Sequence, residues 1–118
     1  MTTTRSSIPC DPGVVVLTRI RFAEGTETKK RPAVVLTNSQ YHDSRADAIV
    51  VALSTQRRAT YYGDCDLRDW QQAGLPLPTK AKGVIQTIDR STIERRLGAL
   101  SSSDLDRVKE SVRLILCL

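Results

Sequence analysis

Long hydrophobic runs are missing from this 118-residue sequence. Its longest uninterrupted apolar stretches, residues 48–53 and 114–118, are far shorter than the roughly 20 residues needed to cross a bilayer. Residues 1–7 are mostly polar and lack the apolar core of a secretory signal peptide. We therefore expect no membrane segment and a cytoplasmic location.

Cysteine, histidine and aromatic residues are also scarce. The three cysteines (Cys10, Cys65 and Cys117) are widely spaced and odd in number, which argues against a disulfide framework or a zinc ribbon and fits a reducing compartment. The single histidine, His42, excludes a mechanism that needs two histidines, and we expect it to be a solvated loop residue. One Phe, three Tyr and one Trp do not support a broad base-stacking surface. No phosphate-binding glycine motif, GxxxxGK[ST] or GxGxxG, is present.

The charge balance is positive. Eighteen Lys and Arg residues face 13 Asp and Glu, a net charge of +5, and most of the cations are arginines, which bind phosphate in a planar, bidentate manner. A polyanionic partner such as nucleic acid would explain this excess. A modest positive charge that only keeps the protein soluble would explain it equally well.

The hydrophobic pattern predicts one α+β domain over residues 12–118, preceded by a flexible arm at 1–11. Alternating or continuous apolar runs predict short strands over 13–22, 32–37, 48–54, 61–67, 83–88 and 94–100. Polar connections are expected at 24–30, 38–47 and 55–60, and one or two helical turns at 67–73, ended by Gly74. Pro32 should lie at a strand start or a sheet edge. These elements predict a small antiparallel barrel.

The C-terminal segment changes period. Ser101–Ser103 offer a helix cap, Asp104 and Asp106 suit a helix N-terminus, and Leu105, Val108, Val112 and Ile115 recur every three or four residues. We expect a helix whose apolar surplus at 114–118 belongs either to the core or, preferably, to a dimer contact.

Two groups of residues suggest chemistry. Asp64 and Asp66, with Asp69 nearby, could bind Mg²⁺, but we favour solvated carboxylates that balance arginines, because a two-metal nuclease needs more of them. Cys65 has no evident base beside it and is interpreted as an inert thiol. Arg31 and Ser54 stand at a strand start and a strand end, where a guanidinium and a hydroxyl could converge on one phosphate.

The order and spacing of several motifs resemble the MazF/PemK toxins, endoribonucleases of type II toxin–antitoxin modules. The resemblance runs from about Cys10 to the C-terminus. Its motifs are Gly13 before a Val-rich strand, Lys-Lys-Arg31-Pro32-Ala-Val-Val-Leu, Ile-Val-Val-Ala-Leu-Ser54-Thr-Gln56, Asp69-Trp70-Gln-Gln-Ala-Gly74-Leu, Gln86-Thr-Ile-Asp89-Arg-Ser and Ile93-Glu-Arg-Arg-Leu-Gly98-Ala-Leu-Ser. The resemblance implies an SH3-like barrel with a C-terminal helix, a homodimer, cleavage of single-stranded RNA without metal or cofactor, and an acidic antitoxin as partner.

Matched residue by residue, Arg31 takes the place of the family's catalytic arginine, and Ser54 that of a residue that is usually threonine. The RNA-binding residues expected around them are Lys29, Lys30, Thr55, Gln56, Arg57 and Arg58. The chain departs from the family at Gly13-Val14, where a glycine–acid pair is usual, and at Gly83-Val84, where an acid–polar pair is usual.

Two other functions remain open at this point. One is a non-catalytic SH3-like module that binds a peptide or single-stranded nucleic acid. The other is a toxin on the same fold that binds a protein target, as gyrase poisons do. Neither needs both Arg31 and Ser54, so these residues favour the nuclease.

Overall fold

The computed structural model describes residues 11–21, 27–56 and 60–118. Its strands are β1 (Val14–Arg21), β2 (Thr28–Val35), β3 (Asp47–Ser54), β4 (Cys65–Asp66), β5 (Lys80–Asp89) and β6 (Arg95–Ala99). Its helices are α1 (Ser39–Ser44), α2 (Ser102–Leu116) and a short 3₁₀ turn, η1 (Arg90–Thr92). Most of the arm expected at 1–11 lies outside the described residues.

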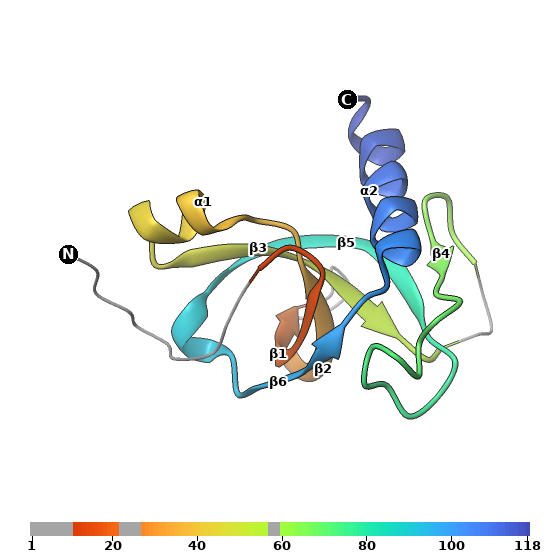
Figure 1. Ribbon diagram of the computed structural model, residues 1–118, viewed down its shortest axis with the longest axis horizontal. Coiled ribbons are helices and arrows are strands. Elements are labelled where there is room, and N and C mark those ends of the chain that lie inside the picture. The colour runs from red at the N-terminus through yellow and green to blue at the C-terminus, as the bar shows by residue number, and fades with distance from the viewer. Residues whose placement is uncertain (1–10, 22–26, 57–59) are drawn as a thin grey trace.

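The six strands form one antiparallel sheet in the order β4-β5-β3-β2-β1-β6. The sheet curls strongly, and α2 rises from it beside β4, while α1 lies along the opposite end of β3 (Figure 1). The prediction of a small, mainly β, antiparallel barrel with a C-terminal helix is confirmed.

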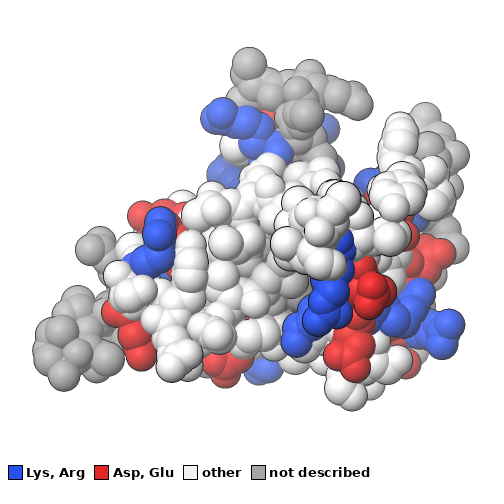
Figure 2. Space-filling view, turned by 90° about the horizontal axis from the view of Figure 1, so that it is seen from above, with Lys and Arg blue, Asp and Glu red and all other residues white. Residues whose placement is uncertain are grey.

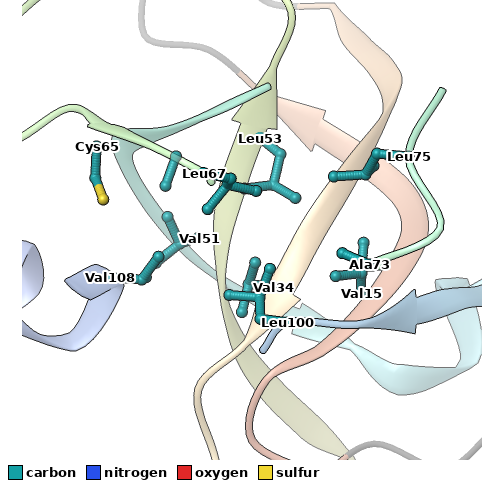
Figure 3. Packing of buried hydrophobic residues seen from close by; sticks show 11 residues of the cluster. Val15, Val34, Val51, Leu53, Cys65, Leu67, Ala73, Leu75, Leu100 and Val108 are labelled. Carbon is teal, nitrogen blue, oxygen red and sulfur yellow. The ribbon is translucent and has the colours of Figure 1, made fainter. Parts of the chain in front are cut away.

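Strand β3 is buried on both of its faces, as its continuous apolar run predicts. Ala48, Val50 and Ala52 belong to one hydrophobic cluster, and Val51 and Leu53 belong to a second cluster. Because side chains alternate along a strand, the two clusters lie on opposite faces of the sheet. The second cluster is capped by α2 and by residues 67–75 (Figure 3).

Helix α2 follows the predicted pattern. Ser101 caps it by accepting a hydrogen bond from the Asp104 N–H at 3.1 Å. Val108 is buried in the second cluster, with Leu105 and Val112 packed against it. Among the described residues no helix has the length and apolar character needed to cross a membrane.

The Asp104 carboxylate joins the start of α2 to the connection after β4. It is fully buried and accepts hydrogen bonds from the backbone N–H groups of Arg68 at 3.1 Å and Asp69 at 2.8 Å. The Arg107 guanidinium donates to the same carboxylate at 3.2 Å and to the Asp66 carbonyl oxygen at 2.5 Å. A buried carboxylate is tolerated here because hydrogen bonds and a cation compensate its charge.

The β1–β2 hairpin is longer than the sequence suggests. Thr28 to Lys30, expected to lie in a loop, are the first residues of β2 and pair with Arg21 to Arg19 of β1. The polar side chains of these residues give no strand pattern of their own, and the strand forms only through pairing with the other arm of the hairpin. Pro32 lies within β2, where the pairing with β3 ends, so it occupies a local edge rather than the strand start.

The connection between β2 and β3 contains a helix that the sequence analysis missed. Asn38 caps α1 by accepting from the Tyr41 N–H at 3.0 Å. His42, expected in a solvated loop, is buried, and its Nε2 lies 2.6 Å from Thr37 Oγ1. Arg90 donates from Nη2 to the His42 carbonyl oxygen at 2.7 Å. These contacts pull a polar segment against the sheet.

Residues 61–75 depart most from expectation. The strand expected at 61–67 is only the two-residue β4, and 67–73 form a hydrogen-bonded turn rather than a helix. Gly74 ends this turn at φ +80°, as predicted. A Cβ on Gly74 would lie 2.0 Å from the Leu97 carbonyl oxygen, and one on Gly98 would lie 2.4 Å from that of Ala73. Both glycines therefore allow two backbone segments to touch.

We predict that acid destabilises the protein through His42. Burial, followed by the charge of Arg90, lowers the pKa of His42 in the folded state, although Asp11 and Asp43 act in the opposite direction. The unfolded chain then binds a proton at His42 more readily than the folded protein does. The contribution of neutral His42 to the free energy of unfolding is therefore full above about pH 6.5 and falls as the pH drops below that value. In urea unfolding at pH 7.5 and 5.5, His42→Gln should lose less stability than the wild type. Equal losses in the two proteins would contradict this role.

Candidate active site

Arg31 is placed by the β1–β2 hairpin. It pairs with Thr18 of β1, is half-buried, and donates from Nη1 to the Lys30 carbonyl oxygen at 2.9 Å. The following Pro32 has no N–H to donate to a neighbouring strand. Arg31 therefore lies on the part of β2 that does not pair with β3.

Ser54 is the last residue of β3. Its Oγ accepts a hydrogen bond from the Gln56 N–H at 3.0 Å, which turns the chain out of the sheet and fixes the hydroxyl oxygen. The side chain is half-buried. The hydroxyl hydrogen remains able to donate to a ligand.

Arg31 and Ser54 occupy corresponding positions on the two strands. The last pair between β2 and β3 is Ala33 with Ala52, and Arg31 and Ser54 each lie two residues beyond that pair, where the strands no longer pair. Because strand side chains alternate, both belong to the sheet face of Ala33 and Ala52. The two residues thus flank the opening where β2 and β3 separate.

Lys80 is a residue of this site that sequence analysis missed. It pairs directly with Ser54 and, on its other side, with Asp66 of β4, so the three residues form a row across the sheet. Lys80 is 5% exposed, and its Nζ donates to Thr60 Oγ1 at 2.9 Å. The strand was expected to begin only at Gly83, although extending its alternation backwards would have included Lys80.

The other predicted RNA-binding residues are divided. Lys29 is exposed and shares the strand face of Arg31, whereas Lys30 lies on the opposite face. Lys30 forms an ion pair with Glu94 at 2.9 Å. Thr55 and Gln56 are exposed beside Ser54. Arg57 and Arg58 lie outside the described residues.

An open groove of about 500 Å³ lies next to the hairpin end. Two arginines, two carboxylates and neutral residues line it: Arg19, Arg21, Thr28, Gln86, Thr87, Ile88, Asp89, Thr92 and Glu94. The Gln86 amide bonds to both the N–H and the carbonyl oxygen of Arg21, which ties β5 to the end of β1. On the face seen in Figure 2, uncharged residues fill the middle, and basic and acidic side chains lie near one another at the left and at the lower right.

Asp64 and Cys65, which were also considered for chemistry, have structural surroundings. Asp64 forms an ion pair with Lys82 at 2.7 Å, and their side chains are 2% and 12% exposed, so its partner is a lysine rather than the arginines that we expected. Burial, the largest single influence, would raise the pKa of Asp64, but the hydrogen bond and charge of Lys82 and the backbone hydrogen bonds of Tyr61 and Gly83 together outweigh burial and lower that pKa. Burial raises the pKa of the Cys65 thiol, which disfavours the reactive thiolate. Within the described ranges, no three His, Cys, Asp or Glu residues cluster as metal ligands.

Comparison with known proteins gives a consistent result. The family described as "PemK-like, MazF-like toxin of type II toxin-antitoxin system" matches residues 11–116. A search of curated protein sequences found no match.

Several solved structures share the fold. MazF from Deinococcus radiodurans is 18% identical with a TM-score of 0.74, over 96% of this chain and 100% of that one. A MazE–MazF structure from the same organism is 19% identical with a TM-score of 0.72, over 96% and 99%. An endoribonuclease from a mycobacterial species in complex with its cognate antitoxin is 19% identical with a TM-score of 0.69, over 92% and 95%.

Proposed function

The chain belongs to the PemK-like, MazF-like toxin family of type II toxin–antitoxin systems, and from this premise we propose that it is an endoribonuclease that cleaves single-stranded RNA without a metal ion. The observation that carries the proposal is the placement of Arg31 and Ser54 at the opening between β2 and β3. The likeness to a mycobacterial endoribonuclease supports it. Cleavage of mRNA would inhibit translation and growth, and a protein with this activity would act in the cytoplasm.

The proposed reaction uses the RNA as its own nucleophile. The 2′-oxygen bonds to the adjacent phosphorus, its proton passes to water, and the bond from phosphorus to the 5′-oxygen breaks as that oxygen takes up a proton. Arg31 stabilises the additional negative charge on the phosphoryl oxygens, and the Ser54 hydroxyl donates to one of them. This chemistry needs neither a metal nor a histidine.

We predict that Arg31 acts on the transition state and Lys29 on binding. In EDTA, the wild type should cut single-stranded RNA, and Arg31→Ala should lower the single-turnover rate by roughly 10²–10³-fold. Its affinity for a non-cleavable RNA should fall much less, because other cations still contact phosphates. The matched variant Lys29→Ala should weaken binding and its salt dependence, but leave turnover nearly intact.

Two further variants extend this experiment. Ser54→Ala should slow cleavage, and Ser54→Thr should keep or improve it, because threonine retains the hydroxyl and restricts its rotation. Melting temperatures separate chemistry from folding. A normal cleavage rate in Arg31→Ala would refute the mechanism, and uncut RNA with the wild type would favour a binding module or a protein-targeting toxin.

The exposed end of α2 supports a homodimer. Leu114, Leu116 and Leu118 are 52%, 50% and 84% exposed, an apolar surface that a second copy would cover. Sedimentation equilibrium at micromolar concentration should show a dimer, and Leu116→Asp should shift it towards the monomer. The matched control is Leu77→Asp, because Leu77 is similarly exposed, at 55%, but lies outside α2. A monomeric wild type would contradict the prediction.

We also propose that an acidic antitoxin and RNA compete for one surface. The groove expected between the loops at 24–30 and 55–60 includes Lys29, but residues 24–26 and 57–59 lie outside the described ranges. Carboxylates of the antitoxin would take the place of RNA phosphates beside the basic residues expected there, Lys29, Lys30, Arg57 and Arg58. Saturating antitoxin should therefore abolish RNA binding in a filter-binding assay. A ternary complex with undiminished cleavage would exclude a shared surface.

A further inference from the structure

A small pocket lies between β4, β5 and the turn that follows β4. Its volume is about 260 Å³, and six residues line it: Asp66, Leu67, Trp70, Pro78, Thr79 and Lys80. The backbone bond from the Leu67 N–H to the Thr79 carbonyl oxygen, 3.0 Å long, holds its two sides together. Sites for drug-sized ligands occupy about 300–1,000 Å³, so this pocket suits one planar ring system.

The pocket adjoins the candidate active site. Lys80 lines the pocket and is the direct cross-strand partner of Ser54, and Asp66 stands on the other side of Lys80. Neighbouring strands are about 4.8 Å apart, which sets Asp66 about 10 Å from Ser54 across the sheet. A base attached to a nucleotide beside the cleaved phosphate spans such a distance.

The lining residues provide the contacts that a base needs. Trp70 is half-buried and offers an aromatic face on which a base can stack. Asp66 is exposed, and its carboxylate only accepts hydrogen bonds. A carboxylate repels phosphates, so beside an RNA backbone it is suited to reading N–H groups on a base edge. Lys80 adds a positive charge on the same wall, next to which a base carbonyl oxygen is favoured.

We propose that this pocket binds a guanine base of the RNA next to the cleavage position and so sets sequence preference. Guanine presents two adjacent donors, N1–H and the 2-amino group, which one carboxylate can accept together, and its O6 lies beside them. Adenine, cytosine and uracil lack such a donor pair. The proposal rests on the proposed nuclease function, because it assumes that RNA lies across Ser54.

Trp70 is the only tryptophan of the chain, so its fluorescence reports directly on the pocket. The probes are four 2′-O-methyl RNA pentamers, UUXUU with X as guanine, adenine, cytosine or uracil, which cannot be cleaved because they lack a free 2′-hydroxyl. The guanine pentamer should quench Trp70 fluorescence and bind about tenfold more tightly than the others. Replacing guanine by hypoxanthine, which lacks the 2-amino group, should remove most of this preference.

Asp66→Asn tests whether the Asp66 carboxylate accepts the hydrogen bonds of guanine. The variant should keep the wild-type melting temperature, because the Asp66 contacts with Arg107 and Cys65 are made by its backbone carbonyl oxygen, and it should lose the guanine preference. The control is Asp69→Asn. It removes a carboxylate charge only three residues further along the chain, but Asp69 does not line the pocket, so this variant should keep the guanine preference. Equal quenching by all four pentamers, or an unchanged preference in Asp66→Asn, would overturn the proposal.

The outcome is separable from that of the nuclease proposal. Guanine-selective quenching without cleavage of natural RNA would support the pocket and refute the nuclease. Cleavage with no selectivity at guanine would support the nuclease and refute the pocket.

Discussion

Burial of both faces of β3 is the constraint on which the rest of this structure depends. A strand with apolar side chains on each side must be covered twice, once by the curl of the sheet itself and once by α2 and the connection after β4. A slip of one residue would exchange the two clusters, so the register with β2 and β5 is strongly specified. That same register places Ser54 beside Lys80, and it leaves both Ser54 and Arg31 just beyond the last pair between β2 and β3.

Local pattern predicted the elements that carry their own signal. The alternation in β1, the apolar run of β3 and the three-to-four periodicity of α2 were sufficient to place these elements. The pairing of Thr28 to Lys30 was not predictable, because polar residues become a strand only through a partner across the hairpin. Helix α1 has no apolar stripe, and its N-cap residue, Asn38, is the one helix signal that the sequence offers there.

The candidate site was predictable in part for similar reasons. Arg31 and Ser54 were noticed as a guanidinium and a hydroxyl at the ends of predicted strands and were assigned roles through a family resemblance; the sheet register places both just beyond the last β2–β3 pair. Lys80 escaped notice because nothing local distinguishes a buried lysine from a surface one. Gly83 stands where the family usually has an acidic residue, and its packing gives a reason for the small residue. A Cβ at this position would lie 3.3 Å from Ile115 Cδ1 of α2, so a larger side chain would press against that helix.

The contact between Gly74 and Gly98 also bears on how this protein avoids self-association through its sheet. Strand β6 is an outer strand, and unpaired outer strands recruit further strands from other molecules into fibrils. Here the backbone at 73–74 lies against Leu97 and Gly98, which sterically shields that border. At the opposite border β4 is only two residues long and pairs with Ala81 and Lys80 of β5. The β6 margin is therefore blunted against strand addition, so copies of the chain that meet on that side would do so through side-chain surfaces.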